Sequence, residues 1–196
     1  MKLSIERQES YSRGQLLLRT FFGAFYIALP HVFILYFIMI ASAFLNFLTF
    51  WVIMFTGKHP RSWWDFQMNF QRWNLRLNAS LLNLRDEYPP FGMSAQMPGV
   101  TLEAEYPESN SRGSVLLRTL FGFFYVLLPH AFILMFRGIA CYFIIFIAFW
   151  AVLFTGKYPE GMFKFVVDTI RWSTRVNFFM MYMNDEYPPF SGAENP

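Results

Sequence analysis

Two histidines, His31 and His130, each follow a proline in the middle of a long apolar stretch. An imidazole in such a place can ligate haem, bind a quinone or relay protons. It can also bond a backbone carbonyl that the proline leaves unpaired, or bridge two parts of the protein. Because neither stretch contains a carboxylate to act as proton partner, we favour the structural role. Arg137 is the third polar candidate inside these stretches.

Two arginine pairs follow the pattern Arg-Trp-x-x-Arg, at residues 72–76 and 171–175. Residues four apart share a helix face, so two guanidinium groups beside a tryptophan suit lipid phosphates at a membrane surface. Solvated charge that obeys the positive-inside rule explains them equally well. A lysine also follows the glycine that ends each apolar stretch, at the level of the headgroups. The candidate lipid-contacting residues are Arg72, Trp73, Arg76, Arg171, Trp172, Arg175, Lys58 and Lys157.

Residue patterns typical of catalysis do not occur in the sequence. It contains no Ser-His-Asp set, no close carboxylate pair, no metal-ligand cluster and no phosphate-cradling glycine loop. The Thr-Gly-Lys triplets at 56–58 and 155–157 lack the leading glycine of a nucleotide-binding loop. A single cysteine allows no internal disulfide, and a net charge of +3 gives no support to nucleic-acid binding. We therefore expect no enzyme, no cofactor, no metal and no nucleic-acid partner.

The elements that carry the candidate residues are strongly apolar. Hydrophobic residues make up 55% of the 196, aromatic residues 21% and charged residues 15%, whereas about a quarter of an ordinary soluble domain is charged. Residues 16–55 contain one charge, and residues 115–154 contain two. Each run exceeds the roughly 18 apolar residues that mark a spanning helix. The sequence therefore predicts an integral membrane protein.

The chain is a tandem duplication. A shift of 99 residues aligns the sequence with itself without a gap, and about half of the aligned positions are identical. Both copies end in Asp-Glu-Tyr-Pro-Pro-Phe. We expect a polar N-terminal segment (1–11), a first module (12–91), a polar linker (92–110), a second module (111–190) and a C-terminal tail (191–196).

The charge distribution predicts how each copy enters the membrane. Because the linker is polar, one crossing per copy would put the basic residues of the two copies on opposite faces, against the positive-inside rule. Two crossings per copy place 15 of the 16 lysines and arginines on one face, together with all 13 acidic residues. We therefore expect a hairpin in each copy, with helices at 15–38 and 41–55 in the first, and both termini in the cytoplasm. The second helix is only about 22 Å long, so a re-entrant hairpin is the alternative.

An amphipathic helix is predicted after each hairpin. In residues 61–85 the apolar side chains recur three or four apart, which gives one continuous stripe. Such a helix lies at the membrane interface or packs on the hairpin. The closing Asp-Glu-Tyr-Pro-Pro-Phe is a helix stop or a docking peptide, and its presence in both copies favours the stop. The predicted fold class is an all-α integral membrane protein with two tandem repeats, each a transmembrane or re-entrant helical hairpin followed by an interfacial amphipathic helix.

Four motifs occur in a fixed order in both copies: Pro-His-x-x-x-Leu, Phe-Thr-Gly-Lys-x-Pro, Arg-Trp-x-x-Arg and Asp-Glu-Tyr-Pro-Pro-Phe. This series resembles the bacterial family of membrane proteins with the DUF4389 domain, over nearly all of residues 12–91 and 111–190. The resemblance implies a bacterial membrane protein with one or two copies of the module, and it implies no catalytic residues. Arg137 departs from the repeat, because the first copy has Ile38 at the matching position.

Three functions fit these observations. The leading hypothesis is a non-enzymatic accessory or scaffold subunit of a larger assembly in the bacterial inner membrane. Its partners would be other membrane subunits and phospholipid, and a homo-oligomer is a further option. The second hypothesis is a lipid-binding or lipid-transfer-associated membrane protein. The third is a haem- or quinone-binding redox subunit that uses His31 and His130.

Overall fold

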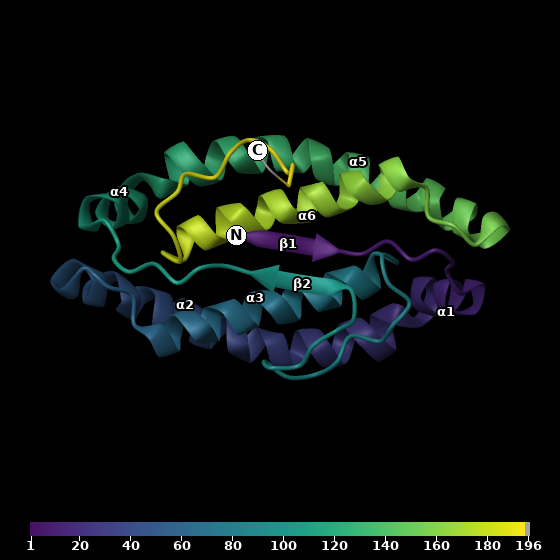
Figure 1. The fold of residues 1–196 in the computed structure, drawn as a ribbon, viewed down its shortest axis with the longest axis horizontal. Helices are drawn as coiled ribbons and strands as arrows, with labels where there is room; N and C mark the ends of the chain where they lie inside the picture. Colours follow the sequence, from purple (N-terminus) through teal and green to yellow (C-terminus); the bar gives the residue numbers. More distant parts are fainter. Residues whose placement is uncertain (195–196) are drawn as a thin grey trace.

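The computed structural model describes residues 1–194 and is mostly helical (Figure 1). The first copy consists of β1 (Lys2–Ile5), α1 (Arg13–Gly23), the π-helical η1 (Ala24–Ala28), α2 (Leu29–Thr56) and α3 (Arg61–Leu81). The second copy consists of β2 (Val100–Glu103), α4 (Arg112–Gly122), the π-helical η2 (Phe123–Leu127), α5 (Leu128–Thr155) and α6 (Glu160–Met180). The repeated order of elements agrees with the duplication seen in the sequence.

Each copy has one continuous helix where the sequence predicted a hairpin. The first copy joins α1, η1 and α2 into a helix of 44 residues, Arg13–Thr56, and the second copy has its counterpart at Arg112–Thr155. Residues 39–42, where the turn was expected, are helical, because they contain neither proline nor glycine to interrupt the backbone hydrogen bonds. Arg137 and Gly138 are helical as well. The predicted hairpins are therefore wrong, and two long helices, not four, have the length and composition to cross a membrane.

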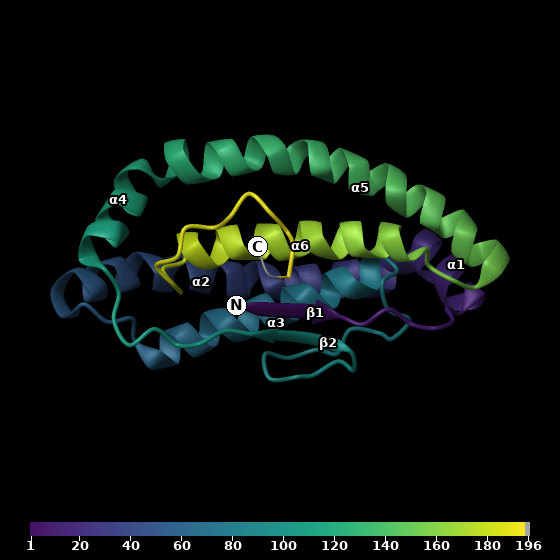
Figure 2. The same ribbon diagram turned by 45° about the horizontal axis from the view of Figure 1, so that its top comes forward.

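A π-helical segment precedes the proline in each long helix. Proline has no N–H for the carbonyl four residues back, and its ring crowds that carbonyl. The wider turns of η1 and η2 lie just before Pro30 and Pro129, and the helix continues beyond both prolines. Figure 2 shows the resulting bow, with α4 and α5 arching over α6. Gly57, at a φ of +74°, takes the left-handed conformation that ends α2, and Gly156 does the same for α5.

The segments predicted to be amphipathic are helical, as α3 and α6, and each helix packs along the long helix of its own copy. In α3, Trp73 and Leu77 of the predicted stripe are buried against Ile27 and Leu35 of the long helix. A second face of α3 is buried in the main core through Trp64, Met68, Leu75 and Ala79. The helix is thus covered on two faces, where one stripe was expected.

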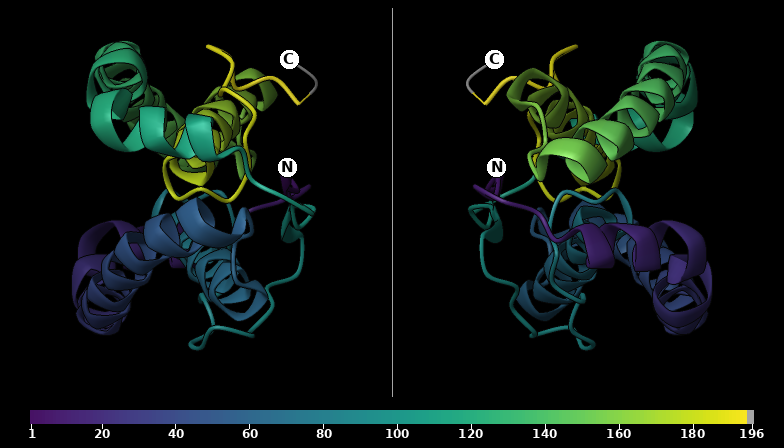
Figure 3. Two further views of the ribbon diagram at one scale, coloured as in Figure 1. Left: turned by 90° about the vertical axis from the view of Figure 1, so that its left-hand side faces the viewer. Right: turned by 90° about the vertical axis from the view of Figure 1, so that its right-hand side faces the viewer.

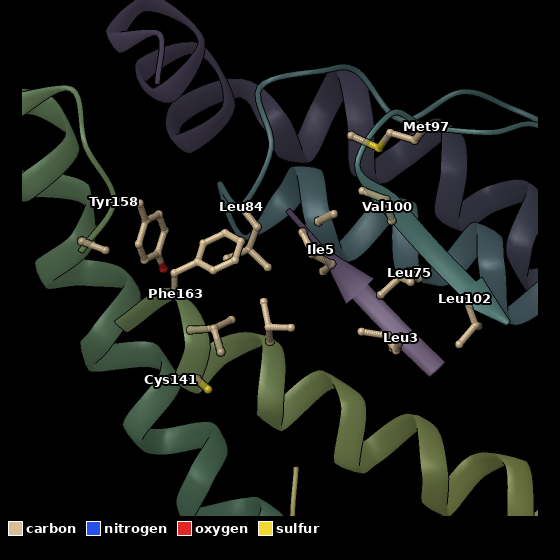
Figure 4. Close-up of a cluster of buried hydrophobic side chains, with 14 of the residues drawn as sticks. Leu3, Ile5, Leu75, Leu84, Met97, Val100, Leu102, Cys141, Tyr158 and Phe163 are labelled. Carbon is tan, nitrogen blue, oxygen red and sulfur yellow. The ribbon is translucent and has the colours of Figure 1, made fainter. Parts of the chain in front are cut away.

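The main core lies between the two copies. β1 and β2 pair antiparallel, and Leu3 lies opposite Leu102, which is its equivalent in the 99-residue repeat. An approximate two-fold axis therefore passes between these leucines. Figure 4 shows side chains of both copies meeting around the strands, among them Leu75 and Phe163. Neither strand was predicted, since both lie in segments that read as a polar tail and a polar linker.

The copies also exchange contacts across this axis. Arg72 of α3 donates to the carbonyl of Leu102 in β2, and Arg171 of α6 donates to the carbonyl of Leu3 in β1. The strand that precedes each module is thus bound by the helix of the other module. Viewed end-on, both long helices lie on one side of the molecule, while β1 and the N-terminus lie on the other (Figure 3).

Candidate functional site

Motifs that are far apart in each copy converge on its histidine. The His31 side chain is fully buried, and the indole N–H of Trp73 donates to its Nδ1 at 2.8 Å. The Phe91 ring stacks on the imidazole, with the ring centroids 3.9 Å apart. Because Nδ1 accepts a hydrogen bond, the neutral imidazole carries its proton on Nε2. We call this cluster of His31, Trp73 and Phe91 the histidine box.

The second copy builds the same box. Trp172 donates to His130 Nδ1 at 2.9 Å, and the Phe190 ring stacks 4.1 Å from the imidazole. His130 is also fully buried. The two boxes are thus equivalent by the repeat, as duplicated structural sites would be.

The tyrosine of the closing motif completes the proline site. Pro30 cannot bond the carbonyl of Tyr26, four residues before it, and the Tyr88 hydroxyl donates to that carbonyl at 3.1 Å. In the second copy, Tyr187 donates to the carbonyl of Tyr125 at 2.9 Å. We expected the histidine either to bond the carbonyl that the proline leaves free or to bridge two parts of the protein. The tyrosine does so instead, and the histidine is paired with the tryptophan.

The aspartate of the closing motif holds the start of the long helix. Arg19 is buried and pairs with Asp86 at 2.8 Å, and the second oxygen of Asp86 accepts from the backbone N–H of Ser12. Arg118 and Asp185 form the equivalent pair in the second copy. These four charged residues were not among the candidates that the sequence singled out. The sequence signal that could have identified them is that the arginine and the aspartate recur at matching positions in both copies. Loss of the aspartate would leave the arginine buried without its carboxylate, which is strongly destabilising.

Within residues 1–194, Nδ1 of each imidazole accepts a hydrogen bond, while Nε2 is buried without a partner. One ring face and one nitrogen of each imidazole are occupied by its own copy. Each box ties the long helix to α3 or α6 and to the closing motif. The structural role that we favoured for His31 and His130 stays a prediction, as does the alternative of haem or quinone binding.

The arginines of the Arg-Trp-x-x-Arg motifs bind backbone carbonyls. Arg76 is buried and donates to the carbonyls of Gly92 and Ala95, both at 2.6 Å. Arg175 donates in the same way to Ser191 and Ala193. Burial, and secondarily the charge of Arg72, lowers the pKa of Arg76. These contacts fold the chain after each closing motif back onto α3 or α6, and lipid contact by these arginines stays a prediction.

The remaining candidates lie in different surroundings. Lys58 and Lys157 are exposed where the long helices end. Arg137 of α5 points to α6, where its Nε donates to the Thr169 hydroxyl at 3.1 Å and its guanidinium lies 4.3 Å from the centre of the Phe165 ring. Its charge is therefore held by the protein inside an otherwise apolar helix.

Two cavities adjoin these elements. One, of about 340 Å³, lies between α3 and residues 93–103 and is lined in part by Arg72 and Arg76. The other, of about 460 Å³, lies between α2, α3 and α6 and is lined in part by Asn46, Asn74 and Asn177. Within residues 1–194, no three His, Cys, Asp or Glu side chains are grouped closely enough to hold a metal ion.

Comparison with known proteins agrees with the repeated architecture. The model of the domain of unknown function DUF4389 matches twice, at residues 15–92 and 112–192. Both matches begin near the start of a long helix and end just beyond a closing motif. No curated protein and no solved structure matches the chain. With most of its length covered by the two matches, the chain belongs to the DUF4389 family as a tandem duplication of the module.

Proposed function

We propose that this protein is a non-enzymatic scaffold or accessory subunit of a bacterial inner-membrane assembly, seated in the bilayer by its two long helices. The observation that carries the proposal is the distribution of exposed apolar side chains. Of the 40 large apolar residues that are exposed, 17 lie on the first long helix and 19 on the second. Soluble proteins rarely expose an apolar surface of this extent, and acyl chains or apolar helices of partner subunits would cover it.

The structure favours long helices that lie along the membrane plane. A helix of 44 residues is about 66 Å long, roughly twice the hydrocarbon thickness. In an upright position, the Asp168–Arg171 pair of α6 and Arg137, which lies against α6, would be near the bilayer centre, where charges are costly. With the helices flat, both long helices face the bilayer from one side of the molecule (Figure 3). The basic residues and both termini then belong to the cytoplasmic side.

Cysteine labelling from each side of the membrane tests this orientation. In a Cys141→Ser background, Gln15→Cys and Lys58→Cys mark the two ends of the first long helix, where both residues are exposed. A membrane-impermeant maleimide should label both positions from the cytoplasmic side. Labelling of the two positions from opposite sides would show that the helix crosses the bilayer and would exclude the flat orientation.

The scaffold role requires a stable protein partner. Purification of the full chain from its source membrane in mild detergent, followed by native mass spectrometry, should reveal a stoichiometric membrane subunit. A chain that arrives alone or as a homo-oligomer, with phospholipid retained, would overturn the accessory-subunit role while leaving the orientation intact.

Lipid binding is the second candidate function, and the cavity of about 460 Å³ favours it. Asn46 lines the cavity, and its buried Oδ1 has no hydrogen-bond partner within residues 1–194. Asn74 and Asn78 direct their amide N–H groups to helix carbonyls, so their oxygens remain as acceptors. An uncharged set of acceptors beside apolar helices suits a headgroup rich in hydrogen-bond donors. Asn46→Leu should reduce the phospholipid that co-purifies, whereas Asn74→Leu tests the same cavity from α3.

A further inference from the structure

We propose that the first copy carries a binding site for the phosphate group of a soluble ligand, in the cavity between α3 and residues 93–103. The cavity measures about 340 Å³, and no residue of either long helix lines it. Asn69, Arg72 and Arg76 contribute from α3, Ser94 and Gln96 from the loop, and Glu103 from β2. This inference is independent of how the long helices sit in the membrane.

Within residues 1–194, the two guanidinium groups use four of their ten N–H donors in hydrogen bonds. Each arginine has five N–H donors. Arg72 uses one for the Leu102 carbonyl and one for the amide oxygen of Asn69, and Arg76 uses two for carbonyls of the loop. The Arg76 side chain is only 3% exposed, and its buried Nε has no partner within residues 1–194. Free donors on two neighbouring guanidinium groups match the oxygens of a phosphate.

The positive charge of this cavity is not compensated by an ion pair. Within residues 1–194, neither Arg72 nor Arg76 lies within 4 Å of a carboxylate oxygen, and Glu103 at the rim is exposed. Arg76 is buried and Arg72 is half-buried. A buried positive charge without a carboxylate partner is costly, and repulsion between the two guanidinium groups adds to this cost. A bound dianion would offset both effects.

The second copy shows how the same framework looks without such a site. Asp168 stands there in place of Asn69 and pairs with Arg171 at 2.5 Å. Arg171 also donates to the carbonyl of Gly192. A side chain on Gly192 would collide with the backbone of Asp168, so the tail lies directly on α6. In the second copy, Asp168 thus neutralises Arg171 and the tail covers it. In the first copy, Arg72 and Arg76 face a cavity.

Inorganic phosphate is the probe for the first test. Isothermal titration of the full chain in detergent, against chloride at equal ionic strength, should show phosphate binding. Asn69→Asp should weaken binding about tenfold or more, because the carboxylate competes for Arg72 as Asp168 does for Arg171. The matched change Asp168→Asn in the second copy should leave the affinity unchanged. The unfolding midpoint of each variant serves as the check that it is folded.

Three results would overturn the proposal. The first is a wild-type chain that shows no binding of phosphate above chloride. The second is an equal affinity for phosphate in wild type and Asn69→Asp. The third distinguishes the source of the phosphate: if Asn69→Asp affects only binding to phosphatidate-containing vesicles and not binding of free phosphate, the ligand is a lipid.

Discussion

A histidine in an apolar helix can act as a ligand, as a proton relay or as a structural hydrogen-bonding group. In the structure, Trp73 fixes the tautomer of His31, and Phe91 covers one face of the ring. A buried polar atom with its partner contributes modestly to stability, but one without a partner is costly. Loss of the Trp73 indole should therefore lower the free energy of unfolding, because Nδ1 of the buried imidazole would lose its hydrogen-bond donor.

Trp73→Phe should destabilise the protein by about 1–3 kcal/mol, because it leaves the Nδ1 of His31 buried without a donor. Thermal unfolding in detergent measures the change. Trp172→Phe is the matched variant in the second copy and should have a similar effect. Trp51→Phe, on the exposed apolar surface, should have little effect, and an equally large loss there would contradict this explanation.

His59 makes the stability of the protein fall as the solution becomes acidic. It lies outside the long helices, is buried, and its Nδ1 lies 3.1 Å from the carbonyl of Pro60. Burial lowers its pKa below the ordinary value of 6.5, so the folded state binds fewer protons than the unfolded state as the pH falls below 6.5. The contribution of His59 is therefore fully present above about pH 7.5 and is lost as the pH falls, with a slope of at most about 1.4 kcal/mol per pH unit.

Unfolding midpoints measured between pH 7.5 and pH 5 should fall less steeply in His59→Gln than in wild type. The second copy has Tyr158 at the matching position, so only the first copy carries this titration. A slope that is unchanged in His59→Gln would assign the pH dependence to other groups.

At the scale of elements, each long helix passes through a proline because another element takes over the lost hydrogen bond. Tyr88 supplies the donor for the Tyr26 carbonyl, and η1 supplies the extra space. The closing motif is distant in sequence, but it supplies a hydrogen bond that the long helix lacks.

A double-mutant cycle tests this coupling. Tyr88→Phe should cost about 0.5–1.5 kcal/mol in the wild-type background, because the Tyr26 carbonyl loses its donor. In the Pro30→Ala background the cost should be smaller, since the new N–H at residue 30 can serve that carbonyl. Unfolding free energies of the four proteins give the coupling. An identical cost in both backgrounds would mean that the tyrosine acts independently of the proline.

The sequence predicts the helical content and the duplication, because the first depends on apolar patterns within each copy and the second on the match between the copies. The hairpin prediction is wrong. The distribution of charged residues indicates on which side of the membrane they lie, but it does not determine the path of the chain between them. Residues 39–42 already lacked a breaker, which was the local signal for a continuous helix. The strands were missed because four-residue segments such as Lys2–Ile5 pair only with a partner about a hundred residues away. The site of Arg72 and Arg76 depends in part on the difference between Asn69 and Asp168. The effect of that difference becomes visible only when the spatial neighbours of both residues are known.

At the scale of the whole molecule, the copies hold each other through exchanged strands and helix ends. Arg13 donates to the carbonyls of Leu153 and Phe154 at the end of the second long helix, and Arg112 donates to Phe55 at the end of the first. These cations complement the negative ends of the helix dipoles. The copies are therefore joined both by the covalent linker and by non-covalent contacts.

A protease site inserted between Glu108 and Ser109, which are both exposed, should yield a cleaved protein that still elutes as one particle in mild detergent. The shared core and the strand pair account for this expectation. Leu3→Asp, at the axis of the pair, should make the cleaved halves separate. Separation of the halves without that substitution would show that the linker is needed to hold the copies together.

The exchange of strands bears on how such a chain could have arisen. A lone module would leave the donors of its central arginine and the edge of its strand without partners, and a second identical module would satisfy both. The same contacts would join two separate single modules as a homodimer, and a tandem duplication fixes that stoichiometry in one chain. The halves of such a chain need not remain identical, and these two differ at Ile38 against Arg137 and at Asn69 against Asp168.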